Sequence, residues 1–271
     1  MSVTEVDRAG HPFWKWVGGK RQLLSRLVPM VPARFGRYHE PFIGGGALYF
    51  ALGPRHATIA DSNTRLVRTY RGVQGHVDEV ILRLSGLSND RETFERVRAS
   101  DVDAMSDAGV AAWLVYLNKT GFNGLYRVNS RNIYNVPFGA MTKPNICDER
   151  RLRACAAQLA TTEILDAGFE TVLDRASKGD FVYFDPPYVP LSTSSMFVSY
   201  TKDGFGMDDQ RRLVEVAATL KRRGVHVLLS NSAAPAVYEL YRGFEIEEVE
   251  LQRLVGAKSS SRGAIKELLI R

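Results

Sequence analysis

One short apolar run constrains the fold of this chain more than any other feature. Residues 181–184 are Phe-Val-Tyr-Phe, and a run without polar alternation is typical of a strand buried on both faces. Such strands occur in sheets that helices cover on both sides. Further short apolar runs at 57–62 and 225–231 alternate with helical patterns. The sequence therefore predicts an α/β fold with a doubly wound sheet.

The remaining elements follow from the same patterns. We expect strands over 38–43, 57–62, 163–169, 181–185 and 225–231, a closing strand pair over 244–253 and 264–271, and helices over 48–52, most of 63–118 and 208–223. Asp208 is the predicted N-cap of the last helix, and Gly224 is expected to end it.

Residues 119–147 interrupt this alternation. They are rich in Asn, Gly, aromatic and basic residues, with turn signals at Asn-Gly and Lys-Pro-Asn, which is typical of a loop. We interpret 63–147 as an inserted, mainly helical subdomain with a hairpin at about 119–138. The catalytic domain would then comprise 1–62 and 148–271.

Length and composition limit the class of protein. The 271 residues fit one large domain with an insertion, and no apolar run approaches the ~20 residues that span a membrane. The first residues lack a signal-peptide pattern. The two cysteines, Cys147 and Cys155, fit a reducing cytoplasmic compartment, and no Cys/His spacing suggests a metal. The net charge of +6 permits binding to a polyanion without establishing it.

The strand at 181–184 is followed by Asp-Pro-Pro-Tyr. Neither Pro186 nor Pro187 has an N–H to continue a sheet ladder, so the chain must leave the sheet as a stiff, extended loop. Ligands of open α/β sheets bind at the carboxyl ends of strands. Asp185 and Tyr188, held rigidly at such an end, therefore indicate a functional site.

A second candidate site lies at Gly44, Gly45 and Gly46, between a strand and a helix. Glycine allows a sharp turn and the close approach of a ligand, although a tight turn alone needs the same residues. Asp61 ends the next strand, where nucleoside-binding folds place an acid for ribose hydroxyls. A phosphate P-loop is excluded because its Lys and Ser/Thr are missing, and Tyr49 stands where a dinucleotide motif has its third glycine. A nucleoside ligand without a pyrophosphate is favoured.

Five segments occur in an order that identifies a family. They are FWKWVGGKRQLL, EPFIGGGALYF, IADSN, LNKTGFNGLYRVN with NVPFG, and DFVYFDPPY. Together they closely resemble the Dam-type DNA adenine N6-methyltransferases (the alpha arrangement of the D12 class), from about residue 12 to the end. The resemblance implies a Rossmann-like methyltransferase sheet, S-adenosylmethionine as methyl donor and double-stranded DNA as substrate.

The resemblance also implies which residues bind the cofactor. Asp61 matches the acid that holds the ribose. Relatives often bind the cofactor's adenine with an acid directly before Phe169, but here Gly168 stands there, and Asp166 is a candidate substitute. The implied cofactor-binding residues are Trp16, Lys20, Phe42, Ile43, Gly44, Gly45, Gly46, Asp61, Asp166, Phe169 and Asp185.

The catalytic motif is Asp185, Pro186, Pro187 and Tyr188. Adenine N6 is a weak nucleophile because its lone pair is delocalised into the ring. If the Asp185 carboxylate and the Pro186 carbonyl each accept one N6–H bond, the lone pair is freed and the developing charge is stabilised. The target base lies inside a duplex, so we expect it to be flipped out and stacked on Tyr188. No cysteine nucleophile and no metal are expected.

The hairpin-like segment is the part that the resemblance assigns to DNA. Arg127 is expected to pair with guanine O6 and N7, with a surface phosphate contact as the alternative. Phe122 is expected to wedge between bases, with core packing as the alternative. In the basic run GAKSSSRG, a solvated linker is the alternative to phosphate binding. The implied DNA-binding residues are Lys15, Phe122, Asn123, Leu125, Arg127, Asn135, Pro137, Lys258 and Arg262. Ala140, Met141 and Thr142 replace the Arg-Tyr-Lys that many relatives carry after NVPFG.

The predicted function is methyl transfer to N6 of a flipped adenine, with GATC as the expected site. A methyltransferase acting on RNA or protein is the first alternative, and a catalytically silent DNA-binding relative is the second. Cytosine N4 methylation usually goes with a serine in place of Asp185 and ranks lower. We expect a monomer on DNA, of bacterial or phage origin, in a restriction–modification pair, a phage or a solitary role such as replication control.

Overall fold

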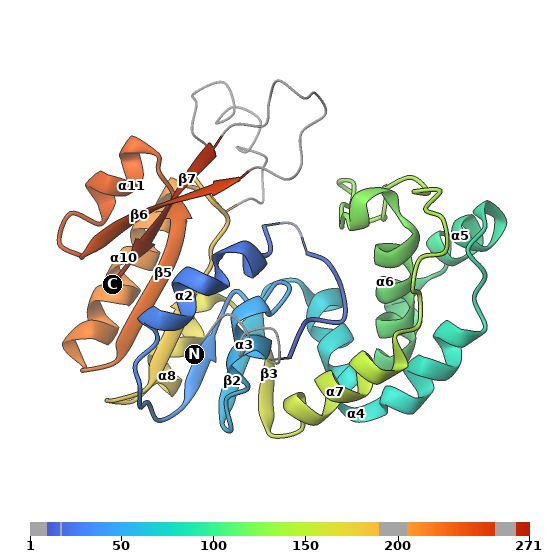
Figure 1. Cartoon of the computed structure of the whole chain (residues 1–271), viewed down its shortest axis with the longest axis horizontal. Coiled ribbons are helices and arrows are strands. Elements are labelled where there is room, and N and C mark those ends of the chain that lie inside the picture. The colour runs from blue at the N-terminus through green and yellow to red at the C-terminus, as the bar shows by residue number, and fades with distance from the viewer. Residues whose placement is uncertain (1–9, 17, 190–204, 253–263) are drawn as a thin grey trace. The chain divides into compact units, whose positions relative to one another are not determined.

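The strands form one mixed, mostly parallel sheet. The computed structural model describes residues 10–16, 18–189, 205–252 and 264–271. The strand order in the described part is β3-β2-β1-β4-β5-β7-β6 (Figure 1). The α/β fold predicted from the sequence is confirmed. The strands are β1 (Tyr38–Glu40), β2 (Ala57–Asp61), β3 (Thr162–Asp166), β4 (Phe181–Phe184), β5 (His226–Ser232), β6 (Ile246–Gln252) and β7 (Ala264–Ile270).

The chain divides into two compact units. Unit 1 comprises Met1–Leu24 and Ile43–Ala167, and unit 2 comprises Ser25–Phe42 and Gly168–Arg271. The α-helices are α2 (Leu24–Met30), α3 (Ala47–Leu52), α4 (Thr64–Ser85), α5 (Arg91–Arg98), α6 (Asp107–Thr120), α7 (Glu149–Leu159), α8 (Val172–Arg175), α10 (Met207–Arg222) and α11 (Pro235–Leu240). Short 3₁₀ turns are η1 (Lys20–Leu23), η2 (Val102–Ala104), η3 (Phe122–Gly124) and η4 (Phe169–Thr171).

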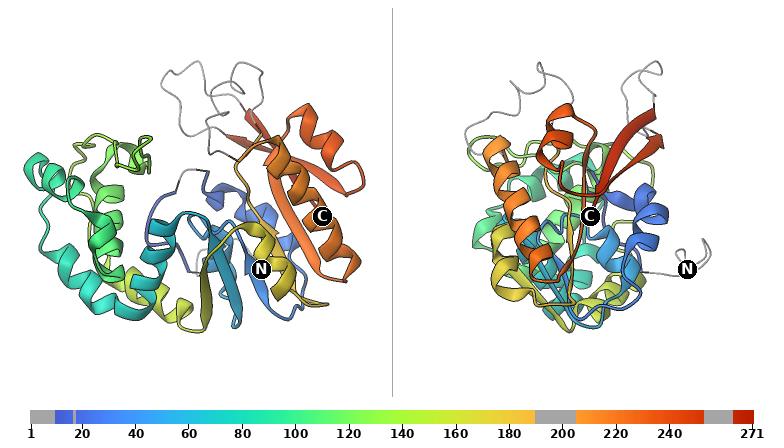
Figure 2. Two further views of the ribbon diagram at one scale, coloured as in Figure 1. Left: turned by 180° about the vertical axis from the view of Figure 1, so that it is seen from behind. Right: turned by 90° about the vertical axis from the view of Figure 1, so that its left-hand side faces the viewer.

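In unit 2, the apolar run at 181–184 is a central strand. It pairs in parallel with β1 and with β5, and β7 lies antiparallel between β5 and β6. Helices α2 and α10 lie on opposite faces of these strands (Figure 2). Both faces of β4 are therefore covered, as its unbroken apolar sequence predicts.

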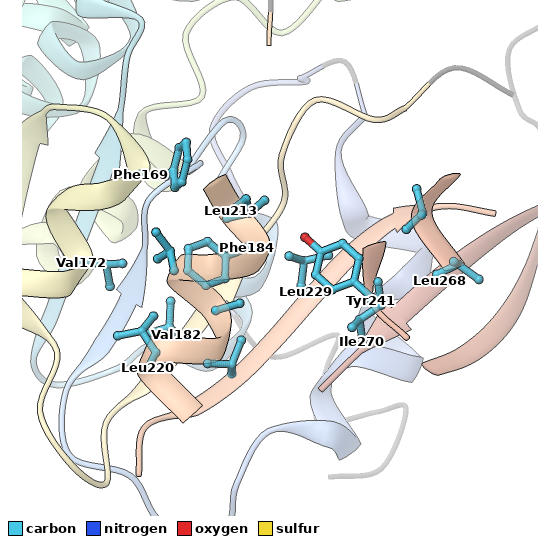
Figure 3. Packing of buried hydrophobic residues seen from close by; sticks show 14 of the residues in the cluster. Phe169, Val172, Val182, Phe184, Leu213, Leu220, Leu229, Tyr241, Leu268 and Ile270 are labelled. Atoms are coloured by element: carbon cyan, nitrogen blue, oxygen red, sulfur yellow. The ribbon is translucent and has the colours of Figure 1, made fainter. Parts of the chain in front are cut away.

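The core of unit 2 shows this alternation residue by residue. Val182 and Phe184 pack with Leu213 and Leu220 of α10 and with Leu229 of β5 (Figure 3). Phe181, which points to the other face, contacts the rings of Phe35 and Tyr38 at centroid distances of 5.7 Å. The burial of large side chains on both faces fixes the register of β4 and therefore the point at which the strand ends.

In unit 1, strands β2 and β3 pair in parallel, so that their carboxyl ends meet. Asp61 is the register partner of Asp166. Helix α4 packs against α6 and α7 (Figure 1). The N-caps of α4 and α6 are Asn63 and Ser106, whose side chains accept a backbone N–H of the first turn. The mainly helical stretch predicted over 63–118 is thus confirmed.

The segment after α6 folds back on itself without forming regular strands. Antiparallel bridges join Gly121 to Phe138 and Val128 to Tyr134. The backbone N–H of Phe122 donates to the carbonyl of Pro137 over 2.9 Å. The two arms of this segment are therefore joined by isolated backbone hydrogen bonds, which hold an irregular hairpin without a continuous β-ladder.

Three predicted boundaries were wrong. The strand predicted over 38–43 ends at Glu40, because Pro41 has no N–H for the ladder. The strand predicted over 163–169 ends at Asp166. Asp208 is not the N-cap of α10: Gly206 holds that position, and its N–H donates to Asp209 Oδ2 over 2.7 Å. Asp209, at the third position of the helix, and not Asp208 satisfies this backbone donor.

The close approach of α4 to α6 gives a test of the packing in unit 1. A Cβ added at Gly72 would lie 2.3 Å from the carbonyl oxygen of Asp107, which is backbone and cannot turn away. We expect Gly72→Ala to lower the free energy of unfolding by about 1–3 kcal/mol, the usual cost of overpacking. Denaturant unfolding measures the change.

Gly75→Ala is the matched control in the same helix. An added Cβ there meets nothing within 4 Å, and the helix is interrupted at the next residue, His76 (φ −141°, ψ 37°), so we expect the stability to be unchanged. If the two variants had equal free energies of unfolding, the close approach of α4 to α6 at Gly72 would not contribute to stability.

Candidate active site

Asp185 follows directly on β4 and is held from the neighbouring strand. Ser230 Oγ lies 3.1 Å from Asp185 Oδ1 and donates to it, and the hydroxyl of Tyr183 lies 2.8 Å from the same Ser230 Oγ. Burial, together with the charge of Asp185, raises the pKa of Tyr183 well above its ordinary value. Tyr183 therefore stays a neutral phenol, and the chain of hydroxyls orients one carboxylate oxygen.

Tyr188, the last residue of the Asp-Pro-Pro-Tyr loop, is also anchored at its polar end. Its hydroxyl donates to Glu267 Oε2 on β7 over 2.7 Å. Burial raises the pKa of Tyr188 well above its ordinary value, and the charge of Asp185 acts in the same direction. The ring is half-buried, with a fixed hydroxyl and a stiff diproline segment before it.

A buried polar network holds the backbone of this loop. Gln210 Nε2 of α10 donates to the carbonyl of Pro187 over 2.9 Å, and its Oε1 accepts from Asn231 Nδ2 over 3.1 Å. The N–H of Val189 donates to Asn231 Oδ1 over 3.4 Å, and Ser232 Oγ donates to the carbonyl of Val189 over 2.6 Å. Each of these buried side chains has a partner, so the network fixes a single loop shape.

In unit 2, three aromatic rings contact one another. Phe42 stacks on Phe169 with centroids 5.5 Å apart and an interplanar angle of 21°, and Phe205 meets both edge-on. A Cβ at Gly168 would lie 2.9 Å from Glu170 Oε2. The carboxylate of Glu170, which pairs with Arg212 over 3.3 Å, therefore lies beside Gly168.

In unit 1, Asp61 shapes the glycine loop. Its Oδ2 accepts the N–H of Gly44 over 3.2 Å, and its Oδ1 accepts the N–H of Asn63 over 3.0 Å. Burial raises the pKa of Asp61 above its ordinary value, these two backbone donors oppose the rise, and the charge of Asp166 adds to it. Asp61 is half-buried, whereas Asp166 is exposed at the end of β3.

The loop needs glycine because an indole ring covers it. A Cβ at Gly44 would lie 3.0 Å from Trp16 Cδ1, and one at Gly45 would lie 2.9 Å from Trp16 Cβ. Gly46, with φ +67°, caps α3 in a left-handed conformation. Trp16 in turn stacks on Tyr126 at 5.5 Å and 21°. The structure therefore brings Trp16, the glycines and Asp61 together.

Two further predicted cofactor residues are buried in unit 1. Ile43 is in the core, and its N–H donates to the carbonyl of Ala60 over 3.0 Å. Lys20 is 6% exposed, and its Nζ donates to the carbonyl of Gly18 over 2.7 Å. A buried ammonium needs hydrogen-bond partners, and the Gly18 carbonyl is one. Lys20 therefore stabilises this part of the chain and is also a candidate to contact the cofactor.

The hairpin holds Arg127 in a defined position. Its Nε donates to Asn135 Oδ1 over 2.7 Å, and its Nη2 donates to the carbonyl of Asn135 over 3.1 Å. Phe122 is 50% exposed despite its size, and Asn123 has the left-handed φ of +56°. These features leave an aromatic ring and a guanidinium on the accessible part of the segment.

Three other predicted DNA-binding residues form hydrogen bonds through their main-chain atoms. The carbonyl of Leu125 accepts from the Tyr134 hydroxyl over 3.1 Å, and that of Pro137 from the N–H of Phe122. Lys15 is tied to the hairpin by Asn118, whose side chain bonds both Lys15 and Gly124. Lys258 and Arg262 lie outside the described residues.

Several residues that build the site were missed in the sequence. They are Ser230, Asn231 and Gln210 around the loop, Glu267 beside Tyr188, and Asn118 under the hairpin. One signal was available: Ser230 and Asn231 interrupt a strand that is otherwise apolar, and a polar residue in a buried strand needs a partner. Gln210 and Glu267 gave no such signal.

Comparison with known proteins identifies the family. Residues 16–255 match the D12 class N6 adenine-specific DNA methyltransferases, and the chain belongs to this family. It is 43% identical over 267 residues to the type II methyltransferase M1.LlaDCHI of Lactococcus lactis subsp. cremoris, covering 96% of this chain and 94% of the relative. It is 38% identical over 285 residues to M.MjaIII of Methanocaldococcus jannaschii, covering 96% and 98%.

A third relative is a DNA adenine methylase, the kind of protein that the motifs resemble. The chain is 30% identical over 261 residues to the DNA adenine methylase of Escherichia coli K12, covering 95% of this chain and 93% of the relative. The protein is an adenine-specific DNA methyltransferase, and this family depends on S-adenosylmethionine. Among the described residues, none of the helices has the length and apolar character needed to cross a membrane.

The buried network around the loop gives the next test. We expect Gln210→Leu to leave the Pro187 carbonyl and Asn231 Nδ2 without this partner, at a cost of about 1–3 kcal/mol for each group. The free energy of unfolding should fall accordingly, and the methyl-transfer rate of the folded fraction should fall with the loosened loop. Denaturant unfolding and labelled methyl incorporation measure the two effects.

Arg211→Leu provides the control. It also replaces a polar side chain of α10 by leucine, but at an exposed position, where Arg211 pairs with the exposed Asp208, and exposed ion pairs contribute little to stability. If Gln210→Leu matched Arg211→Leu in both measurements, the network would not fix the loop.

Proposed function

We propose that this enzyme transfers a methyl group to N6 of an adenine flipped out of double-stranded DNA, within the sequence GATC. The observation that carries the proposal is the anchoring of Asp185 by Ser230 at the end of β4, in a loop that the Gln210–Asn231 network holds. A carboxylate and an adjacent carbonyl fixed in this way can accept the two N6–H bonds. The loop is then organised before the substrate binds, as electrostatic stabilisation requires.

The catalytic roles follow from that arrangement. The Asp185 carboxylate accepts a hydrogen bond from one N–H of the N6 amino group, and the Pro186 carbonyl accepts one from the other N–H, so the nitrogen lone pair is freed from the ring. The carboxylate also stabilises the positive charge that develops on N6 during transfer. Tyr188 supplies a ring for the flipped base to stack on. Pro187 keeps the segment extended, since its φ is fixed.

The residues of unit 1 fit the nucleoside part of S-adenosylmethionine, which supplies an activated methyl on sulfur when bound. Both Asp61 oxygens accept backbone N–H groups, and each carboxylate oxygen has a second lone pair for a ribose hydroxyl. The glycine loop lies flat under Trp16, where a Cβ would not fit. We assign Trp16, Lys20, Gly44 and Asp61 to this role. The wider proposed set adds Ile43, Gly45, Gly46 and Asp166 of unit 1 and Phe42, Phe169 and Asp185 of unit 2.

The inserted segment 63–147 is the proposed target-recognition part. Arg127 is positioned by Asn135 and has the fork geometry that pairs with guanine. Phe122 is large, apolar and half-exposed, as a residue that wedges between bases must be. The proposed contacts in unit 1 are completed by Lys15, Asn123, Leu125, Asn135 and Pro137. Lys258 and Arg262 are proposed as phosphate contacts from their basic character alone.

Sequence-resolved mapping of N6-methyladenine tests the chemistry and the site together. We expect labelled S-adenosylmethionine to methylate unmethylated duplex DNA at GATC. We also expect Asp185→Ala to lower the rate by at least about 10²–10³-fold, because a preorganised charge in the transition state is lost. Thermal unfolding of the variant serves as the control for its fold.

Three results would contradict the proposal in different ways. Retained turnover in folded Asp185→Ala would remove this carboxylate from the mechanism. Methylation at another motif would preserve the chemistry and reject the specificity assigned to the hairpin. Methyl transfer to RNA or protein in place of DNA would reject the substrate.

Arg127 distinguishes base recognition from general affinity. We expect Arg127→Ala to lose about 1–3 kcal/mol of discrimination at one base pair, since a bidentate contact with guanine is removed. Turnover on sites with each substitution at each position measures the loss, and Arg131→Ala, an exposed arginine of the same hairpin, is the control. An equal decline on all sequences would make Arg127 a phosphate contact.

A further inference from the structure

The hydrogen bond between Tyr188 and Glu267 holds a side chain of the catalytic loop, whereas Gln210, Asn231 and Ser232 bond its backbone. Glu267 lies within β7, between two other strands: its register partners are Ser232 on β5 and Val249 on β6. Its Oε2 accepts the Tyr188 hydroxyl over 2.7 Å. The contact spans many residues of sequence and joins the end of the catalytic loop to an internal strand of the same unit.

The pleat of the sheet places Glu267 among the residues that hold the loop. Paired residues on neighbouring strands share a face, and alternate residues point to opposite faces. Ser230 pairs with Leu269 and Ser232 with Glu267, so these side chains point to one face. Ser230 holds Asp185 and Ser232 holds Val189 from that face. Glu267 therefore belongs to a row of side chains that anchor successive parts of the loop.

A carboxylate is a costly choice for a purely structural acceptor at this point. It is half-buried, it precedes three buried apolar residues, 268–270, and it adds to the negative charge of Asp185 acting on Tyr188 and Tyr183. An amide or hydroxyl would accept the same bond without placing like charges near each other. What the carboxylate provides is a stronger, charge-assisted bond.

That bond limits the motion of the ring. The backbone of Tyr188 follows two prolines and precedes Val189, which Asn231 and Ser232 hold. A bond at the hydroxyl therefore fixes the far end of a side chain whose near end is already fixed. The position of the ring is then set before any base stacks on it. Because a phenol O–H prefers to lie in the plane of its ring, the direction of the bond also restrains that plane, so little conformational entropy is lost on stacking.

We propose that Glu267 is a positioning residue for methyl transfer, which holds the Tyr188 ring in the orientation that receives the flipped base. The inference rests on the proposed role of Tyr188. Glu267 does not contact the reacting atoms; it acts through the phenol. Removing its carboxylate should therefore matter only while the Tyr188 hydroxyl is present.

A double-mutant cycle tests this dependence. The variants are Glu267→Val, Tyr188→Phe and both together, with kcat and KM for duplex DNA measured for each. We expect Glu267→Val to lower kcat about 10–100-fold, the loss of one hydrogen bond to a charged group. In the Tyr188→Phe background, the same substitution should have no further effect. Glu267→Gln, which keeps an acceptor at this position, should recover most of the rate.

A spectroscopic readout separates positioning from loss of structure. With 2-aminopurine at the target adenine, a stacked tyrosine ring quenches the flipped base. The complex of Glu267→Val should emit more strongly than that of the unchanged enzyme. Glu247→Val, the same change at an exposed position on β6, should leave kcat and emission unchanged. Thermal unfolding of each variant serves as the control for its fold.

The outcomes distinguish this inference from the proposed function. If Glu267→Val lowers kcat equally in both backgrounds, or leaves kcat unchanged, Glu267 does not act through Tyr188 and the inference fails. If the unchanged enzyme methylates adenine without any 2-aminopurine response, the stacking role of Tyr188 fails, and the positioning role of Glu267 fails with it. If the Asp185→Ala test alone contradicts the role of Asp185, the double-mutant cycle between Glu267 and Tyr188 still tests the inference.

Discussion

The clamping of one short loop by side chains from strand β5 is the interaction on which the site depends. Because neighbouring residues of a strand point to opposite faces, the sequence Ser-Asn-Ser at 230–232 reaches the loop from both sides of the sheet. Ser230 and Ser232 bond Asp185 and Val189 from one face. Asn231, on the other face, bonds Val189 and Gln210. A loop that leaves a sheet through two prolines has few backbone hydrogen-bond partners, and these side chains provide partners in their place.

The rest of unit 2 is arranged so that this clamp stays rigid. Large apolar residues of β4 and α10 fill the core directly beneath it, and close packing there prevents the strands from shifting in register. The polar groups of the clamp are buried but partnered, which avoids the cost of unpaired donors and acceptors. The chemistry of the site thus rests on ordinary packing combined with complete hydrogen bonding.

The sequence predicted what local pattern determines and missed what distant pairing determines. The buried strand at 181–184, the closing strand pair and the glycine loop were apparent because apolar runs and glycines act over a few residues. Glu267 was missed because β7 lies between β5 and β6 out of chain order, and nothing in its own segment indicates that pairing. The N-cap of α10 was misplaced because Asp208 and Asp209 are equivalent until the backbone direction at Gly206 is known.

The hydrogen bonds of Arg127 have a consequence for base recognition. In the protein alone, Asn135 accepts from Nε and from Nη2 of the guanidinium, which uses two of its five N–H donors. In the proposed complex, guanine would bind donors that remain, so the base and Asn135 would hold the arginine at the same time. The long side chain is already ordered in the protein alone, and little of its rotamer freedom is left to lose when the correct contact forms.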